Sequence, residues 1–322
     1  MPIIAQSSYP NPPLFQFNGH VQTIAPSIFR KIEGVNYQRE RLELPDGDFV
    51  DLDWLTNQAD KLVVLTHGLE GDSGRHYIKG TAKLFFQHGW DALAWNCRSC
   101  SGQMNRAFRL YNHGEIGDLH EVITHACRNK NYQRVVLVGY SMGGNITLKY
   151  LGTKGAALSD RIKAGLAFSA PTDLLSSAKL LDKPHNWFYR QRFMKKLVLK
   201  MTQKAAAFPE RIDMGCLKNV KKWQDFDDLF SAPINGYRDA LDFYEQGSAI
   251  NYVAGTAVPV LICNAQNDPL LSAECAPTQL GKQHPLIFVE TPARGGHVGF
   301  MVPNDEFTWA ERRALAFCEA YS

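Results

Sequence analysis

One serine lies in a pattern that favours nucleophilic chemistry. The segment Gly139-Tyr140-Ser141-Met142-Gly143 follows the apolar run VVLVG and precedes a helix-compatible stretch. A G-x-S-x-G segment between a strand and a helix is typical of a sharp turn that exposes the serine, and its two glycines relieve crowding against the adjacent backbone. The alternative is that Ser141 only caps a helix. The flanking strand and helix favour the nucleophile.

A serine hydroxyl becomes an effective nucleophile when a base removes its proton, so a histidine and an orienting acid are required. Asp268 follows the apolar run VPVLIC, and His297 follows the run LIFVE and two glycines. The chain order is therefore Ser, Asp, His, and both partners come after predicted strands. We predict Asp268 and His297 as the partners of Ser141. Other candidates for the acid are Asp173, Asp225, Asp227 and Asp228.

A second glycine-containing turn predicts where developing negative charge would be held. His67-Gly68-Leu69-Glu70-Gly71 follows the apolar run VVLT. Backbone N–H groups at such a turn and just after the nucleophile can bind an oxyanion more strongly than a ground-state carbonyl. We predict the amides of Leu69 and Met142 as this pair of donors. The alternative is an ordinary strand-to-helix turn.

Alternating and continuous apolar runs predict the elements that position these residues. Residues 37–44 and 49–55 alternate apolar and polar around the turn PDGD, which favours an antiparallel hairpin at a sheet edge. Continuous apolar runs predict strands buried on both faces, and these are 62–66, 92–96, 135–139, 164–169, 258–263 and 286–289. Helical periodicity lies between and after them, at 116–126, 145–151 and 307–321. Strands that alternate with helices indicate a mostly parallel sheet with helices on both faces.

The alternation stops near Pro171 and resumes at Val258. We therefore predict a core at 35–171 and 251–322, and a helical cap at 172–250 over the carboxyl edge of the sheet. Residues 1–34 are rich in Pro, Asn and Gly, so we predict an irregular arm there.

Bulk properties exclude several classes of protein. The formal charge is +3 over 322 residues, without a long basic run, which argues against a nucleic-acid partner. Seven cysteines at irregular spacings, with neither a signal-peptide pattern nor a long apolar span, favour a cytoplasmic protein. Cys97 and Cys100 have metal-ligand spacing, but a second cysteine pair is missing, so we expect no metal and no cofactor.

A basic amphipathic stretch lies inside the predicted cap. Its apolar residues are spaced as on one face of a helix, and its cations are Arg190, Arg192, Lys195, Lys196, Lys200 and Lys204. The simplest interpretation is a solvated helix face over a core. The alternative is weak contact with a membrane surface.

Five segments together resemble the YheT-like group of α/β-hydrolases, over nearly the whole chain. They are residues 18–23 (NGHVQT), 67–71 (HGLEG), 96–102 (NCRSCSG), 139–145 (GYSMGGN) and 225–228 (DFDD). The resemblance implies the α/β-hydrolase fold, with Ser141, Asp268 and His297 as the catalytic residues and the loop at Leu69 as half of the oxyanion hole. One departure is Ser99, where the group often has glycine.

The resembled group contains esterases and relatives that act on lipids and fatty-acyl esters. We therefore expect a carboxylic ester hydrolase that forms an acyl-enzyme on short to medium acyl esters or monoacylglycerols. One alternative is an acyltransferase that passes the acyl group to an alcohol. Another is a non-catalytic binding protein that retains the fold. The sequence leaves the oligomeric state open.

Overall fold

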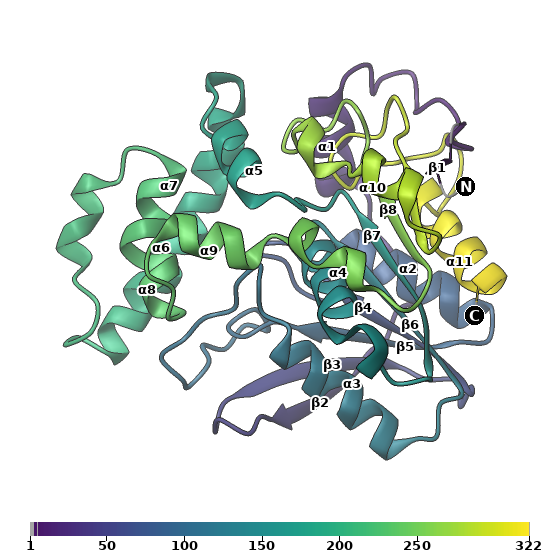
Figure 1. The fold of residues 1–322 in the computed structure, drawn as a ribbon, viewed down its shortest axis with the longest axis horizontal. Coiled ribbons are helices and arrows are strands. Elements are labelled where there is room, and N and C mark those ends of the chain that lie inside the picture. The colour runs from purple at the N-terminus through teal and green to yellow at the C-terminus, as the bar shows by residue number, and fades with distance from the viewer. Residues whose placement is uncertain (1–2, 5, 322) are drawn as a thin grey trace.

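The predicted hairpin and buried strands form one nine-stranded sheet in the computed structural model, which describes residues 3–4 and 6–321 (Figure 1). The strand order is β1-β9-β8-β7-β6-β4-β5-β3-β2. The strands are β1 Ile3–Ile4, β2 Gln38–Glu43, β3 Phe49–Leu55, β4 Lys61–Thr66, β5 Asp91–Asn96, β6 Arg134–Tyr140, β7 Ile162–Phe168, β8 Val260–Cys263 and β9 Ile287–Glu290.

The direction of pairing divides the sheet into two parts. β2 pairs antiparallel with β3, and β3 pairs antiparallel with β5. The other pairs, from β5 through β4 and β6 to β9 and β1, are parallel. β2 is the edge strand and alternates in exposure, whereas every residue of β5 is buried. The mostly parallel sheet with an edge hairpin is therefore confirmed.

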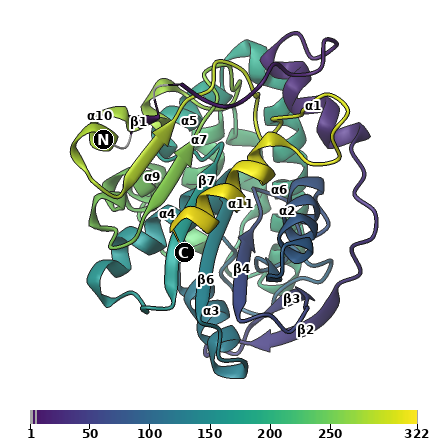
Figure 2. The same ribbon diagram turned by 90° about the vertical axis from the view of Figure 1, so that its right-hand side faces the viewer.

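Helices cover both faces of the sheet, and each face has its own apolar core. α3 and α4 pack on one face, where Leu119, Val122 and Ile146 join the core. α2 and α11 pack on the other, where Phe85 and Phe317 are buried, and Figure 2 shows these two helices on the same side of the sheet. The core helices are α2 His76–Gln87, α3 Gly117–Asn129, α4 Met142–Lys154, α10 Thr278–Gln283 and α11 Trp309–Tyr321.

A helical insertion separates β7 from β8, in agreement with the predicted fold class. In Figure 1 its helices extend to one side of the sheet. They are α5 Leu174–Leu181, α6 Trp187–Ala207, α7 Trp223–Phe226, α8 Ala232–Ile234 and α9 Ala240–Gly247. Aromatic side chains such as Trp223, Phe226 and Phe243 build two small apolar clusters inside it. Within the described ranges, no helix is long and apolar enough to cross a membrane.

The prediction of an irregular arm at 1–34 is wrong for its second half. Residues Gly19–Phe29 form helix α1, whose N-cap Asn18 accepts a hydrogen bond from the amide of Val21. The amino-acid composition gave the wrong prediction because the intrinsic preference of residues for a helix is weak, and contacts with distant segments stabilise α1. A Cβ on Gly19 would lie 1.9 Å from the carbonyl oxygen of Asn267, so this helix packs closely on the late core. Residues 1–2 and 5 of the arm, and residue 322, lie outside the described residues.

Candidate active site

Ser141 lies on the sharp turn between β6 and α4, as the G-x-S-x-G pattern predicts. Its backbone has φ 54° and ψ −123°, a conformation that costs free energy for a residue with a side chain. A Cβ on Gly139 would lie 2.1 Å from the carbonyl oxygen of Gly143, and one on Gly143 would lie 2.2 Å from that of Thr66. Both positions therefore require glycine.

The structure brings the three predicted residues into one hydrogen-bonded chain. His297 Nε2 lies 2.9 Å from Ser141 Oγ, and His297 Nδ1 lies 2.8 Å from Asp268 Oδ2. Asp268 is buried, and its other oxygen accepts the amide of Leu270 at 2.8 Å. An ionised carboxylate accepts only, so Nδ1 carries the proton and Nε2 is free to accept one from the serine hydroxyl. The geometry is that of a nucleophile, a base and an orienting acid.

The other four aspartates have different partners. Asp173 caps α5 through the amide of Ser176, and Asp225 accepts the amides of Lys221 and Lys222. Asp228 accepts the amide of Ala240. Asp227 is buried and accepts the hydroxyl of Tyr244 at 2.7 Å. Of the five candidate aspartates, Asp268 is the one whose carboxylate accepts a hydrogen bond from His297 in the described residues.

The two predicted oxyanion donors lie beside the nucleophile. Neither the Leu69 amide nor the Met142 amide donates a hydrogen bond to any acceptor in the part of the chain that the structure describes. Met142 is the first residue of α4, where the helix dipole favours negative charge. A Cβ on Gly68 would lie 3.0 Å from the Cβ of Ser141, so glycine lets this loop approach the nucleophile. Both amides are therefore available to an oxyanion.

His67 holds the loop of the predicted oxyanion donor Leu69 against the end of the next strand, β5. Its Nδ1 donates to the carbonyl oxygen of Gly68 at 2.8 Å, and its Nε2 accepts the amide of Cys97 at 3.1 Å. The bond from Cys97 requires an unprotonated Nε2, so the two bonds together require the neutral ring with its proton on Nδ1. Burial lowers the pKa of His67 to about 4, so the ring stays neutral near pH 7.

Helix α1 contributes residues that the sequence reasoning did not assign to the site. Gln22 is buried, and its Oε1 accepts the amide of Gly295 at 2.8 Å and the side-chain amide of Asn267 at 2.9 Å. Thr23 Oγ1 accepts the amide of His297 at 2.9 Å. The loops that carry Asp268 and His297 are thus tied to each other through α1. The available signal was the NGHVQT segment, which carries both residues.

Ser99, the departure from the resembled pattern, occupies a backbone conformation that favours glycine. Its φ is 62°, in the left-handed region. Its hydroxyl donates to Asn105 Oδ1 at 2.6 Å and accepts the Asn105 amide at 3.0 Å. These two hydrogen bonds offset the free-energy cost of placing a residue with a side chain in the left-handed conformation.

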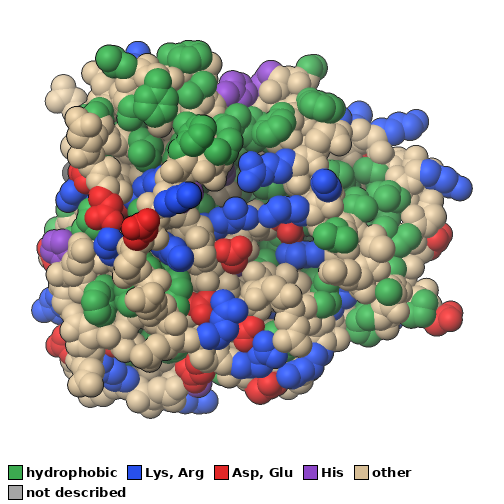
Figure 3. All heavy atoms as spheres, turned by 180° about the vertical axis from the view of Figure 1, so that it is seen from behind, with side chains coloured by type: hydrophobic (Ala, Val, Ile, Leu, Met, Phe, Trp, Pro, Cys, Tyr) green, Lys and Arg blue, Asp and Glu red, His purple; other side chains and the backbone are tan. Residues whose placement is uncertain are grey.

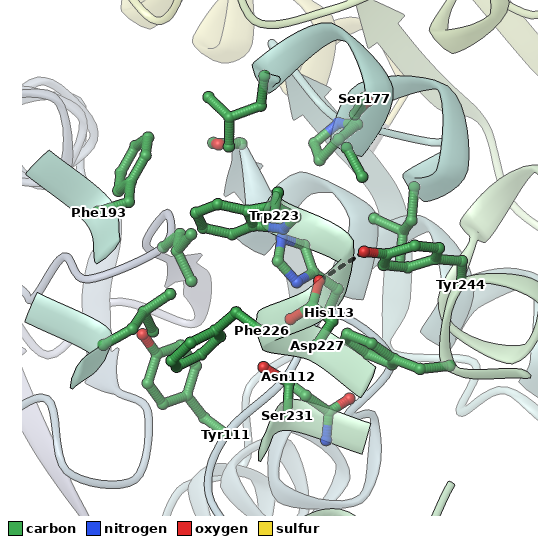
Figure 4. Close-up of a pocket in the computed structure, with 18 of the residues that line it drawn as sticks. Tyr111, Asn112, His113, Ser177, Phe193, Trp223, Phe226, Asp227, Ser231 and Tyr244 are labelled. Atoms are coloured by element: carbon green, nitrogen blue, oxygen red, sulfur yellow. Dashed lines mark hydrogen bonds between the residues drawn. The ribbon is translucent and has the colours of Figure 1, made fainter. Parts of the chain in front are cut away.

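An apolar cavity of about 120 Å³ extends from Ser141 and His297 into the helical insertion. Figure 4 shows Phe193, Trp223 and Phe226 on its wall, with Asp227 bonded to Tyr244 at one side. Burial raises the pKa of Asp227 to about 6, while hydrogen bonds from Ser231 and Tyr244 oppose that rise. A cavity with mainly apolar walls that ends at a nucleophile suits an acyl chain.

The thiols of Cys97 and Cys100 lie in the core beside the site. Burial raises the pKa of the Cys97 thiol well above its usual range and that of Cys100 to about 11. Within residues 3–4 and 6–321, no group of three His, Cys, Asp or Glu side chains could hold a metal ion.

The interpretation of the basic stretch as a solvated helix face is wrong for two of its lysines. Lys200 Nζ forms an ion pair with Glu70 at 2.8 Å, and Lys204 is buried with its Nζ donating to the carbonyl oxygens of Asn105 and Ala107. Burial lowers the pKa of Lys204 to about 8. The long side chains of Lys200 and Lys204 extend to polar partners on the core, and helical periodicity in the sequence does not predict such partners.

Comparisons with known proteins agree on the kind of fold. A family model described as alpha/beta hydrolase fold matches residues 61–303. The "Putative esterase YheT" of Escherichia coli (strain K12) is 35% identical over 291 residues, which cover 88% of this chain and 84% of that protein. The "Phospholipase ABHD3" of Mus musculus is 27% identical over 93% of this chain and 74% of its own length. The esterase Pf2001 of Pyrococcus furiosus has a similar structure, with a TM-score of 0.59 at 16% identity over 98% of this chain and 99% of that one.

Proposed function

The chain belongs to the YheT-like group of the α/β-hydrolase family, and from that premise we propose that it is a serine-dependent carboxylic ester hydrolase. The observation that carries the proposal is the hydrogen-bonded chain from Ser141 through His297 to Asp268. The names of the relatives, an esterase and a phospholipase, also support ester hydrolysis.

Each step of the proposed reaction has a group in position to perform it. Ser141 Oγ attacks the acyl carbon while His297 Nε2 takes the hydroxyl proton, and Asp268 stabilises the resulting imidazolium. The amides of Leu69 and Met142 bind the oxyanion, and each such donor typically lowers the barrier by about 3 kcal/mol. The ester bond to the alcohol then breaks, and the alcohol leaves with the proton from His297. Water, activated by the same histidine, releases the acid and restores Ser141.

The proposed substrates are short to medium acyl esters or monoacylglycerol-like esters. The apolar cavity beside Ser141 supports an acyl chain as the buried half of the substrate. We propose that residues 172–250 act as a cap that supplies most of this wall, over a core at 35–171 and 251–322. All seven cysteines are free, which supports a cytoplasmic location.

The test is hydrolysis of p-nitrophenyl esters of graded chain length by the wild type and by Ser141→Ala. We expect Ser141→Ala to lose activity, and a fluorophosphonate probe to label Ser141 in the wild type, as located by peptide mass spectrometry. Unchanged background rates without labelling would refute the proposal and favour a binding protein. Product analysis with added alcohol separates the hydrolase from the acyltransferase, because the latter would form a new ester at the expense of free acid.

A second proposal is weak contact with a membrane surface near the cavity mouth. Apolar side chains on the arm, on α1 and at the start of α6 are exposed, among them Phe17, Phe29, Trp187 and Phe188. His20 of α1 stacks on Tyr189 of α6 at 5.8 Å, so the two helices adjoin. Figure 3 shows the face of the molecule opposite to that in Figure 1. Hydrophobic side chains lie along its upper edge, above a hollow bordered by Lys and Arg. Exposed apolar groups of this kind mark interaction sites.

Sedimentation with phospholipid vesicles tests this contact. We expect Trp187→Ser/Phe188→Ser to reduce the fraction bound, whereas Leu241→Ser, at an exposed leucine of α9, should not. Equal binding by the wild type and the double variant would contradict the proposal.

A further inference from the structure

A second cavity, of about 280 Å³, meets the apolar cavity at the nucleophile. Ser141 and His297 line both cavities. The wall of the second cavity differs in charge, because it carries Arg30, Arg75, Arg192 and Lys196. An ester has two halves, so two cavities that meet at one nucleophile can hold the acyl chain and the alcohol separately.

Within residues 3–4 and 6–321, three of these four cations form no ion pair with a carboxylate. Arg30 is neutralised by the buried Glu311, to which it donates two hydrogen bonds of 2.7 Å. The ion pairs within the described ranges include none that involves Arg75, Arg192 or Lys196. Among the residues that line this cavity, four cations thus face one carboxylate, that of Glu70, whose charge acts on Lys196. Figure 3 shows Lys and Arg side chains around a hollow on one face of the molecule.

The carboxylate of Glu70, which lines this cavity, already has other partners. The Glu70 side chain accepts the hydroxyl of Tyr111 and pairs with Lys200. Its backbone carbonyl oxygen instead accepts Arg75 Nη2 at 2.7 Å and Lys196 Nζ at 3.1 Å. Two cations thus converge on one neutral oxygen, in the residue after Leu69. Burial lowers the pKa of Lys196, and the charge of Arg75 adds to that effect.

Holding like charges together costs free energy that an anion between them would recover. A phosphate carries about two negative charges and several acceptor oxygens, and guanidinium and ammonium groups form strong charge-assisted bonds to it. A phosphate bound there would lie on the alcohol side of the scissile bond, because the apolar cavity takes the acyl chain.

We propose that Arg75, Arg192 and Lys196 bind a phosphate group carried by the alcohol half of the ester. The preferred substrates are then acyl esters of phosphorylated alcohols, such as a monoacylglycerol phosphate. The covalent steps stay as described: the acyl group moves to Ser141 and the phosphorylated alcohol leaves with the proton from His297. The inference rests on the proposed function.

The test compares two esters that differ only in the phosphate, 1-octanoylglycerol and 1-octanoylglycerol 3-phosphate, both below their micelle concentrations. The variant is Arg192→Gln/Lys196→Gln, in which the second substitution keeps a side-chain donor for the Glu70 carbonyl. The matched control is Lys195→Gln, at an exposed lysine on the same helix that does not line the cavity. Thermal unfolding of each protein establishes that it is folded.

The wild type should hydrolyse the phosphorylated ester with the higher kcat/KM. The ratio of the two kcat/KM values should fall about tenfold or more in the double variant, the usual effect of losing a bond to a charged group. Lys195→Gln should keep the ratio of the wild type. Glycerol 3-phosphate should inhibit hydrolysis of the neutral ester competitively, and more strongly than inorganic phosphate.

Hydrolysis of both esters with a ratio that the double variant leaves unchanged would overturn this inference and leave the proposed function standing. A second result would also overturn it: inorganic phosphate inhibits as strongly as glycerol 3-phosphate, and the wild type hydrolyses the two esters with equal kcat/KM. The site would then bind free anions only. Hydrolysis of neither ester, nor of p-nitrophenyl esters, would instead refute the proposed function.

Discussion

Replacing Gln22 should reduce catalysis more than its distance from the reacting atoms suggests. Its Oε1 accepts two N–H groups, from Gly295 and Asn267, and its Nε2 donates to the carbonyl oxygen of Gln16 at 2.8 Å. Gln22→Met keeps most of the side-chain volume but leaves these three polar groups unpaired. A buried unpaired group costs about 1 to 3 kcal/mol, so the free energy of unfolding should fall by roughly 3 kcal/mol.

The effect on turnover comes from the position of His297. Gly295 lies two residues before His297, and Asn267 directly precedes Asp268, so both partners of Ser141 lose a support. A displacement of about 1 Å in catalytic geometry can reduce the rate about a hundredfold. We expect kcat to fall by that order while KM changes little, because Gln22 lines neither cavity beside Ser141.

The assay is steady-state hydrolysis of p-nitrophenyl butanoate well below the unfolding temperature of each variant, together with the rate of fluorophosphonate labelling. Ile28→Ala, at an exposed position of the same helix, serves as the control and should behave as the wild type. A folded Gln22→Met enzyme with the kcat and labelling rate of the wild type would refute the reasoning.

Three further predictions concern stability, pH and chain length. Ser99→Ala should lower the free energy of unfolding by about 1 kcal/mol more than Ser99→Gly in urea titrations, because alanine keeps the left-handed backbone cost and loses both bonds to Asn105; equal losses would contradict this. The folded pKa of His67, about 4, lies below its unfolded value, so the unfolded chain binds more protons and stability falls as pH decreases from about 6.5 toward 4. Between pH 7 and pH 5 the free energy of unfolding should fall by roughly 2 kcal/mol less in His67→Asn than in the wild type. The same pH dependence of this free energy in both proteins would exclude a neutral buried ring. Leu197→Trp fills the apolar cavity, so hydrolysis of the octanoyl ester should fall about tenfold relative to the butanoyl ester, and an unaltered ratio would place the acyl chain elsewhere.

The features that sequence reasoning predicted well are those with a strong local pattern. Continuous apolar runs of β-branched residues fit buried parallel strands, and a G-x-S-x-G segment after such a run fits one kind of turn. Because Asp268 and His297 each follow a strand of the same parallel sheet, their meeting with Ser141 could be predicted from chain order. The edge hairpin followed from simple alternation in β2 and β3.

The features that it missed depend on contacts between distant segments. Helix α1 is short and contains Pro26, and it is held by the loops around Asn267 and Gly296, more than two hundred residues away. The inward direction of Lys200 and Lys204 depends on Glu70 and on carbonyl oxygens of the core. The charge contrast between the two cavities likewise depends on which cations find carboxylate partners, and that became visible only in the folded chain.

Detection of the acyl-enzyme tests the central claim most directly. The protein would be mixed with p-nitrophenyl octanoate, quenched in acid within the first turnovers, and measured by intact mass and by peptide mapping. We predict one octanoyl group per chain on the peptide that contains Ser141, and none in Ser141→Ala. Ester hydrolysis that proceeds without such an adduct, or an adduct that persists in Ser141→Ala, would contradict the account.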